Sequence, residues 1–529
     1  MKKRTIAMFL SVALCLSVAL TGCGADKSQQ SDPADDGKKS LTIAVLNDVV
    51  SLDPAVKDSS AEMQMASHLY DPLVDYDANL GKKPGLAESW TVLDDGVTWE
   101  FKLRQGVKFS NGNDFNADDV VFSFERILND PTLEMGVYLM RLQEVKKVDD
   151  YTVQLVTKIP YPVFAGSLIH IMMLDKETCE GLTSEEIAAN PVGTGRYRLV
   201  EHVKESYIKL VRNDEYWGEL PDAETVEFRV IANAATRTTA LINGEVDFIS
   251  NIPVMDVDRL KDASNVQVIT NPSLSCSYMG FDLLNEHGSA GTDDPNPLLN
   301  VKVRQAIYHA IDIQTIVDTV MNGYATVANS YMPSICVGYN ANAERPAYDP
   351  ELAKQLLTEA GYPDGFYLRI DARSDSDMNA DQVSQAIASY LEKVGIQTEV
   401  NLLPRASFYE KISAENLQSS FFMSGWGDGS GEGMVIFNDM LYTYNGKPGM
   451  GEGNKGHYSN PEVDALLDQA SVETDQTKRA ALVEQVDQIA RDEAAYIPLF
   501  FKENIFGVRA GIQYTPSADD HILAWDFTF

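Results

Sequence analysis

Short apolar runs and helical apolar stripes alternate along most of this sequence. Residues 41–46 (LTIAVL) form an apolar run of strand length, which is typical of a strand buried on both faces. Residues 89–93 and 97–103 flank the tripeptide DDG, and this pattern predicts a hairpin whose turn needs a positive φ. The same patterns predict strands at 151–157, 224–231 and 247–249, the last after a helical stretch at 238–245. Interleaved strands and helices predict an α/β fold.

The second half contains a predicted strand–helix–strand unit. Residues 366–370 are expected to form a strand, and Asn379 is expected to cap the next helix with Gln382 as its capping-box partner. Gly395 is expected to end that helix, and alternation over 396–402 predicts the second strand. The apolar face of the helix comprises Val383, Ile387, Tyr390, Leu391 and Val394, and two further amphipathic helices are expected at 462–470 and 476–491.

The N-terminus resembles an export signal. Three basic residues at 2–4 precede an uncharged apolar stretch at 5–20, which is short for a membrane span but suits a signal's hydrophobic region. The stretch ends in LTGC, which resembles a bacterial lipobox, so we expect residues 1–22 to be removed and Cys23 to be acylated, for example with palmitate. Residues 23–40 have no apolar periodicity and predict a flexible tether.

The charge balance excludes one large class of partners. The chain has 78 acidic and 43 basic residues, a formal net charge of −35. Nucleic-acid binding needs clustered Lys and Arg, so no nucleic-acid partner is expected. Anionic lipid head groups should also repel the chain, and the lipid on Cys23 would therefore provide the membrane attachment.

Residues with catalytic or metal-binding chemistry do not form a recognisable pattern. The chain lacks a G-x-S-x-G nucleophile elbow, and its seven histidines show no pair at metal-ligand spacing. Cys15 would be removed with the signal and Cys23 would be acylated. The mature chain would then keep three free cysteines, Cys179, Cys276 and Cys336, which allow at most one disulfide. We therefore expect no enzyme activity, no cofactor and no bound metal.

Residues 425–433 (GWGDGSGEG) have the most unusual local composition. Five glycines surround Trp426 and two carboxylates, Asp428 and Glu432, and such a backbone can approach a ligand closely. A surface turn is the alternative interpretation of the same composition.

Several longer segments together resemble the peptide/nickel class of bacterial solute-binding proteins, the dipeptide- and oligopeptide-binding family. The most specific segment is LAESWTVLDDGVTWEFKLRQGVKFSNGNDFNADDVVFSFER at 86–126. The other matching segments are SLDPA at 51–55, NPVGTGRYRLV at 190–200, NDEYWG at 213–218, LLNVKVRQAIYHAID at 298–312, YDPELAKQLLTEAGYPDGF at 348–366 and YSNPEVDALL at 458–467. The resemblance covers essentially the whole chain after the tether.

This resemblance implies a two-lobed periplasmic-binding-protein fold with a hinge and an extra inserted domain. Lobe I would comprise 41–70, 191–270 and 500–529, the inserted domain 71–190, and lobe II 271–499. The family implies an extracytoplasmic protein, here held to the cell membrane by its lipid and expected to be a monomer. It would capture a dipeptide, an oligopeptide or a glutathione-like solute and pass it to ABC permease subunits driven by cytoplasmic ATPases.

The resemblance also implies ligand-binding residues. Asp58, Ser59 and Ser60 match a loop that lines the family's cleft, and Gly425, Trp426 and Gly427 match the segment that pairs with an extended peptide. Dipeptide and oligopeptide binders keep an Asp three residues after this Trp, where the present chain has Gly429.

Charged anchors for the ligand are therefore expected nearby. Asp428 or Glu432 would hold a ligand ammonium, and Arg373, one position from the family's carboxylate-pairing Arg, would hold a carboxylate. The run GSGE ending at Glu432 is more similar to the glutathione-binding branch. The alternatives are an oligosaccharide stacked on Trp426, a metal chelate, or a signalling peptide read by a receptor.

Overall fold

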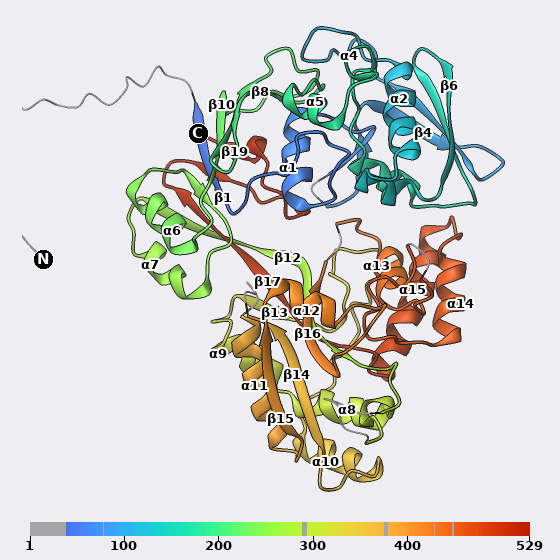
Figure 1. The fold of residues 1–529 in the computed structure, drawn as a ribbon, viewed down its shortest axis with the longest axis vertical. Coiled ribbons are helices and arrows are strands. Elements are labelled where there is room, and N and C mark those ends of the chain that lie inside the picture. Colours follow the sequence, from blue (N-terminus) through green and yellow to red (C-terminus); the bar gives the residue numbers. More distant parts are fainter. Residues whose placement is uncertain (1–38, 78, 288–293, 375–378, 428, 447–448) are drawn as a thin grey trace, which may run out of the picture. The chain divides into compact units, whose positions relative to one another are not determined.

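The structure is a computed structural model that describes residues 39–77, 79–287, 294–374, 379–427, 429–446 and 449–529. The predicted signal and residues 23–38 of the predicted tether, including Cys23, lie outside these residues, as does Asp428. The last residue of the predicted tether, Ser40, instead begins the first strand. Residues 39–529 form one compact unit, in which an eleven-stranded sheet and a separate four-stranded sheet are covered by helices (Figure 1). No helix in the described ranges is long and apolar enough to cross a membrane.

The first lobe is built on one half of the large sheet, where the strand order is β11-β1-β10-β9-β8. The predicted strand at 41–46 is confirmed as β1, and its side chains at Leu41, Ile43 and Ala44 are fully buried. β1 lies between parallel neighbours, β10 and β11, which explains its continuous apolar run. The elements are β1 (Ser40–Val45), α1 (Ser60–Leu69), β8 (Tyr197–Val203), β9 (Tyr207–Arg212), β10 (Thr225–Val230), α6 (Ala234–Asn243), β11 (Phe248–Ile249), α7 (Val257–Lys261), β18 (Gln513–Tyr514) and β19 (Phe527–Thr528).

The inserted part has its own four-stranded antiparallel sheet, in the order β4-β5-β7-β6, and its own apolar core. The predicted hairpin is confirmed as β4 and β5, and Gly96 in its turn has a φ of +72°. The elements are β2 (Val74–Tyr76), β3 (Lys82–Pro84), β4 (Ala87–Val92), β5 (Thr98–Leu103), α2 (Ala117–Asn129), β6 (Leu142–Asp149), β7 (Thr152–Thr157), α3 (Phe164–Ser167), α4 (Lys176–Cys179) and α5 (Ser184–Ala189).

Two long antiparallel strands, β12 (Val266–Phe281) and β17 (Ile497–Arg509), run from the first lobe into the second (Figure 1). Their register shifts between Pro272 and Cys276, where residues 273–275 leave the ladder. Asp520 of the C-terminal segment holds this bulge, because its carboxylate accepts hydrogen bonds from the Ser273 hydroxyl (2.8 Å) and the Leu274 N–H (3.2 Å).

The second lobe continues the sheet in the order β15-β14-β16-β12-β17. The predicted strand–helix–strand unit is confirmed as β14, α11 and β15, with the two strands parallel. The elements are α8 (Val301–Ala310), α9 (Ile313–Thr319), β13 (Ala325–Val327), α10 (Pro350–Glu359), β14 (Tyr367–Arg373), α11 (Ala380–Glu392), β15 (Gln397–Leu403), α12 (Arg405–Lys411), β16 (Phe421–Trp426), α13 (Gly433–Met440), α14 (Pro461–Ala470) and α15 (Gln476–Asp492).

Two details of that unit differ from the sequence prediction. Asn379 is at the N-cap of α11, but it has a left-handed conformation (φ 49°) and its side chain makes no capping bond. Its amide instead donates to the Val320 carbonyl at 3.3 Å, so the predicted capping box is wrong. An N-cap side chain reaches the helix N–H groups from an extended backbone, which Asn379 does not have. Leu402 in β15 is 40% exposed, so the buried face of that strand ends earlier than its alternation suggested.

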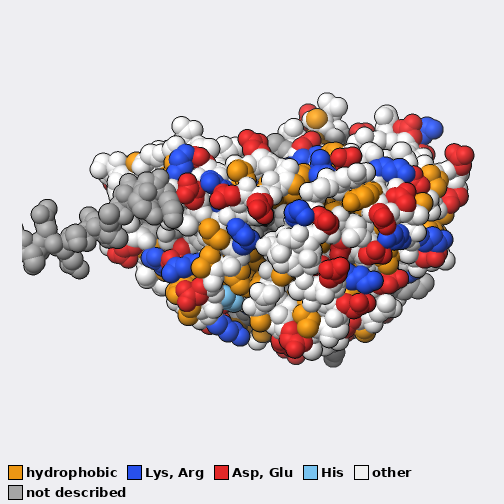
Figure 2. Space-filling view, turned by 90° about the horizontal axis from the view of Figure 1, so that it is seen from above, with side chains coloured by type: hydrophobic (Ala, Val, Ile, Leu, Met, Phe, Trp, Pro, Cys, Tyr) orange, Lys and Arg blue, Asp and Glu red, His pale blue; other side chains and the backbone are white. Residues whose placement is uncertain are grey.

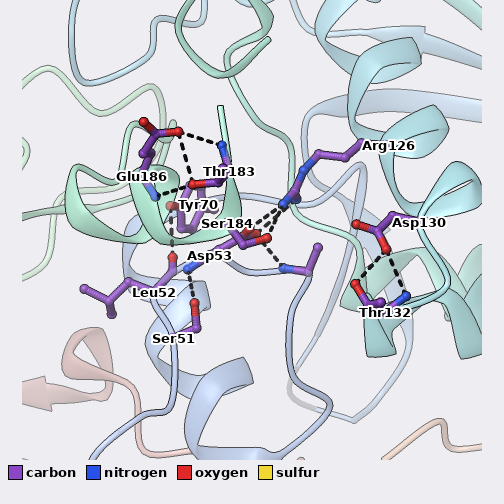
Figure 3. Close-up of polar contacts among 11 residues, drawn as sticks. Ser51, Leu52, Asp53, Tyr70, Arg126, Asp130, Thr132, Thr183, Ser184 and Glu186 are labelled. Atoms are coloured by element: carbon purple, nitrogen blue, oxygen red, sulfur yellow. Dashed lines mark hydrogen bonds and ion pairs between the residues drawn. The ribbon is translucent and has the colours of Figure 1, made fainter. Parts of the chain in front are cut away.

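Two of the sequence motifs meet where the first lobe contacts the inserted part (Figure 3). Asp53 of SLDPA forms a two-pronged ion pair with Arg126, the last residue of the long motif. Arg126 also donates to the Ser184 hydroxyl at 2.9 Å, and the Asp53 side chain is completely buried. This contact fixes the start of the loop that carries Asp58–Ser60.

Charged side chains of both signs are interspersed over the face seen in Figure 2, where Asp and Glu lie beside Lys and Arg. The chain also forms salt bridges between partly exposed side chains, such as Lys57–Glu134 and Lys147–Asp118. The visible face therefore carries no broad basic area of the kind that a nucleic acid would need.

Candidate functional site

A cavity of about 480 Å³ lies where segments distant in sequence meet, and we call it the acidic cavity. Its walls come from the loop before α1, the chain after α1, the inserted part, the bulge in β12, the loop after β16 and the C-terminal segment. The lining residues used below are Asp58, Ser59, Ser60, Asp71, Asp75, Tyr138, His170, Arg196, Leu274, Ser275, Gly427, Gly429, Asp519, Asp520, His521 and Trp525.

Two residues of the inserted part, Glu134 and Tyr138, hold the loop before α1. Glu134 accepts the Lys57 ammonium (2.6 Å) and the Asp58 N–H (3.1 Å). The Asp58 carboxylate in turn accepts from the Tyr138 hydroxyl at 3.1 Å. Partial burial raises the pKa of Asp58, although the Tyr138 hydrogen bond opposes that rise. Asp58 is thus a positioned carboxylate on the cavity wall.

Asp71, on the wall of the acidic cavity, is the buried centre of a polar network. Its carboxylate accepts from the Thr194 hydroxyl (2.8 Å), the Trp217 indole (2.9 Å) and the Tyr216 hydroxyl (3.2 Å). Burial raises the pKa of Asp71, while the charge of Arg196 and these donors oppose the rise. Two family-like motifs, NPVGTGRYRLV and NDEYWG, therefore converge on one carboxylate.

The glycines of the first motif permit this arrangement. A Cβ on Gly195 would lie 2.4 Å from the Leu69 carbonyl carbon, and one on Gly193 would lie 2.1 Å from the Leu69 oxygen. The close approach lets Gly195 N–H donate to Leu69 C=O at 3.1 Å and brings Arg196 to the cavity. The Arg196 guanidinium lies 4.3 Å from the centre of the Trp525 ring, a cation–π distance.

The C-terminal segment contributes a tight acid–histidine pair. His521 Nδ1 lies 3.0 Å from the Asp519 carboxylate, which also accepts the His521 N–H and the Ser517 hydroxyl. Burial acts to lower the pKa of His521, but the hydrogen bond and charge of Asp519 outweigh it and the pKa is raised. Burial likewise acts to raise the pKa of Asp519, yet His521 holds it well below the usual range. Each group therefore favours the charged form of the other.

Two other buried histidines, His170 and His68, have surroundings that lower their pKa values. Burial lowers the pKa of His170 to about 4, and its ring stacks on Tyr138 with 4.2 Å between centroids. Burial also lowers the pKa of His68 to about 4, and that ring donates to the Gln64 carbonyl and accepts from the Ala524 N–H. Among the described residues, no group of three or more His, Cys, Asp or Glu is placed to hold a metal ion.

The net charge of the cavity wall is negative. Among its described residues, the carboxylates of Asp58, Asp71, Asp75, Asp519 and Asp520 outnumber the cationic groups of Arg196 and His521. A cavity lined by one sign of charge attracts a ligand group of the opposite sign. The arrangement can therefore accept a cationic group such as an ammonium.

The structure places the predicted site residues in different parts of the molecule. Asp58, Ser59, Ser60 and Gly427 line the acidic cavity. Gly425 and Trp426 belong to β16, where they pair with Ser277 and Cys276 of β12. Strand β14 pairs with β16 only at Phe421 and Phe422, so in the described chain the second edge of β16 carries no strand from residue 423 onward.

Arg373 and Glu432 lie elsewhere. Neither lines the acidic cavity, and the Arg373 guanidinium lies 5.8 Å from the centre of the Tyr409 ring. Glu432 is buried and forms ion pairs with Lys82 and Arg479. Trp426 donates its indole N–H to Asp439 at 2.7 Å, which fixes the ring at the end of β16.

Sequence reasoning did not single out the wall residues Asp71, Tyr138, His170 or Asp519–His521. Asp71 follows α1 as a lone acid, and Tyr138 and His170 lie in segments with ordinary composition. The run DDH at 519–521 was the available signal, because two acids and a histidine stand together near the C-terminus. Nothing in the one-dimensional pattern places that run beside Asp58.

The chain is similar to known proteins in both sequence and fold. The family model for bacterial extracellular solute-binding proteins, family 5, matches residues 82–448. The glutathione-binding protein GsiB of Shigella flexneri serotype 5b is 30% identical over 470 residues, covering 87% of this chain and 88% of the relative. The structure of HbpA2 from Haemophilus parasuis has a TM-score of 0.81 at 26% identity, covering 92% of this chain and 99% of that chain. DppA from Helicobacter pylori, solved with the peptide STSA, has a TM-score of 0.75 at 25% identity and covers 92% and 97% of the two chains.

Proposed function

Because this chain belongs to family 5 of the bacterial extracellular solute-binding proteins, we propose that it captures a peptide-like solute in the acidic cavity. It delivers that solute to the permease subunits of an importer driven by cytoplasmic ATPases. The proposal includes dipeptides, oligopeptides and glutathione-like molecules, since relatives are named for glutathione and a neighbour was solved with a peptide.

The observation that carries this proposal is the acidic wall contributed by distant segments. A peptide carries an α-ammonium, and a cationic group enclosed between two lobes must be paired because an unpaired buried charge costs several kcal/mol. Asp58 offers a carboxylate held by Tyr138, and Asp519 and Asp520 lie on the same wall. Binding would draw these segments together around the ligand by hinge closure at β12 and β17.

The open edge of β16 supports an extended ligand. A peptide backbone laid along residues 423–427 would form main-chain hydrogen bonds without reading side chains, which is β-augmentation. Gly425, Trp426 and Gly427 keep their predicted role here, and Asp428 stays a candidate second anchor for the ammonium. Arg373 stays a candidate for the ligand's carboxylate only if closure brings it away from Tyr409.

The protein acts by binding alone in this proposal. A hydrolase would need a nucleophile hydrogen-bonded to a base. In the part of the chain that the structure describes, no hydrogen bond joins His521 or His170 to a serine, and Ser59 donates its hydroxyl to Glu62. The chain works as a monomer outside the cytoplasm, held to the membrane by lipid on Cys23.

Native mass spectrometry of the purified protein, followed by calorimetry, tests the proposal. Protein freed of co-purified ligand should bind glutathione or a short peptide, and N-acetylated peptides should bind about tenfold more weakly or worse. Asp58→Asn should lose a similar factor, with Asp428→Asn measured in parallel. Asp214→Asn, at an exposed acid that pairs with Arg212 and does not line the cavity, is the matched control.

Two results would overturn the proposal. One is a co-purified oligosaccharide or metal chelate with no measurable binding of any peptide. The other is cleavage of the added peptides at a rate proportional to protein concentration.

A further inference from the structure

A second cavity, of about 420 Å³, lies between the inserted part and the second lobe. Among the described residues it shares no lining residue with the acidic cavity. Leu80, Lys82 and Trp99 line it from the inserted part, and Val337, Glu432 and Arg479 line it from the second lobe. Its walls thus come from two regions with separate apolar cores.

Glu432 is fixed at the centre of one wall by its backbone. Val337 donates its N–H to the Gly431 carbonyl and accepts from the Gly433 N–H, so the two chains run side by side around Glu432. Gly431 has a φ of +69°, and a Cβ there would lie 3.2 Å from the Leu80 Cβ. Glycine at this position therefore permits the close approach of the inserted part.

The charged groups of this cavity are loosely paired, and two of the three, Glu432 and Arg479, are buried. The Lys82 ammonium lies 3.3 Å from Glu432 Oε1, and Arg479 Nη2 lies 3.5 Å from Oε2. The side chains of Glu432 and Arg479 are 7% and 6% exposed. These distances are long for charge-assisted hydrogen bonds, which are usually about 2.7–2.9 Å. One carboxylate faces two cations, so the cluster retains a net positive charge.

Two buried donor atoms, on residues that line this cavity, have no acceptor among the described residues. They are Arg479 Nε and Trp99 Nε1, and both residues are 5% exposed. A buried donor left unsatisfied costs about 1–3 kcal/mol, and native proteins rarely retain two together. The other Arg479 donor atoms are used, since Nη1 donates to the Glu473 carbonyl at 3.0 Å.

From these contacts we propose that the second cavity is an anion subsite that takes a carboxylate group. A carboxylate accepts several donors at once, so it satisfies Arg479 Nε, Trp99 Nε1 and the Lys82 ammonium together. It also neutralises the excess positive charge. A cationic group finds no such partners, because Glu432 is already shared between Lys82 and Arg479.

Two sources can supply the carboxylate. It can be the acidic end of the peptide-like ligand, which rests on the proposed function, or a separate small carboxylate from solution. Calorimetry on ligand-free protein distinguishes these sources, with succinate, its uncharged analogue succinamide, glutathione and glutathione diethyl ester as probes.

Succinate should bind and succinamide should not. Arg479→Lys, which keeps the charge but removes Nε, should weaken succinate about tenfold. Trp99→Phe keeps an aromatic ring in the core but removes the unpaired donor together with part of the indole, and it should weaken succinate about threefold. Arg259→Lys, at an exposed position of α7, is the matched control. Trp99 Nε1 has no acceptor in the ligand-free chain, so Trp99→Phe breaks no hydrogen bond there. The melting temperature of the ligand-free variant therefore shows whether it is still folded.

The outcomes separate the two proposals. If glutathione loses affinity on esterification and in both variants, the ligand's own carboxylate occupies the subsite. If succinate binds through Arg479 and Trp99 but glutathione and peptides do not bind, the subsite stands and the proposed function fails. The subsite is refuted if succinate fails to bind and glutathione keeps its affinity on esterification, or if succinate and glutathione both bind equally well to wild type, Arg479→Lys and Trp99→Phe.

Discussion

Arg126 and Asp53 form a buried, two-pronged ion pair between the first lobe and the inserted part (Figure 3). Arg126 Nη1 lies 3.1 Å from Asp53 Oδ1, and the Asp53 oxygen also accepts the Ala55 N–H. The arginine side chain is 14% exposed and the aspartate side chain is not exposed. The pair connects two segments that each carry part of the family resemblance.

The first prediction concerns this pair. Arg126→Met should lower the free energy of unfolding by about 3–5 kcal/mol, because it leaves the Asp53 charge buried without its partner. Chemical denaturation monitored by circular dichroism measures the change. Lys57→Met, which breaks the exposed Lys57–Glu134 pair, is the control and should cost much less, because solvent screens exposed ion pairs. Equal losses in the two variants would contradict a special role for the buried pair.

The second prediction concerns the glycine that faces α1. Gly195→Ala should destabilise the protein by about 1–3 kcal/mol, since its Cβ would overlap backbone atoms of Leu69 that cannot move aside. Gly136→Ala is the matched control, because its Cβ would meet only a methyl group of Ile127 at 3.8 Å. Thermal unfolding of both variants checks this, and an unchanged melting temperature for Gly195→Ala would refute the close approach.

The third prediction is a loss of stability in mild acid caused by His68. Burial lowers the pKa of His68 from 6.5 to about 4, outweighing its hydrogen bond to the Gln64 carbonyl. As the pH falls through 6.5, the unfolded chain binds a proton at this residue and the folded chain does not until about pH 4. The free energy of unfolding should therefore fall over this range, by roughly 3 kcal/mol from His68 alone.

His68→Gln isolates that contribution. The variant should be less stable than wild type at neutral pH, yet it should lose less stability between pH 6.5 and 4. Denaturant titrations at several pH values measure both slopes. His521 acts with the opposite sign, since its raised pKa adds stability as the pH falls through that value. Parallel slopes in wild type and variant would show that His68 is not the buried neutral group.

The fourth prediction concerns the N-terminal anchor. Cys23→Ala should release the protein from the membrane fraction while its ligand binding stays unchanged, because the acidic chain offers no other attachment to anionic lipid. Membrane fractionation and calorimetry on the same preparation measure both properties. A Cys23→Ala protein that still sediments with membranes would disprove the lipid anchor.

The local pattern of the sequence was enough to predict several secondary-structure elements. The apolar run of β1, the DDG turn between β4 and β5 and the β14–α11–β15 unit depend on neighbouring residues, and the structure has them where they were expected. Periodicity and turn chemistry are local properties, so a single chain displays them. The family followed from long motifs whose order is itself written in the sequence, and the family model confirms it.

The wall of the acidic cavity was decided by tertiary structure. Asp58 and Asp519 are more than 400 residues apart in sequence, and only the C-terminal segment returning over the first lobe brings them to one cavity. The surroundings of Glu432 could not be predicted from the sequence either. Its sequence neighbours are glycines, whereas its ion partners Lys82 and Arg479 come from distant segments. A charged side chain's role depends on which groups surround it after folding, and those groups are not its neighbours along the chain.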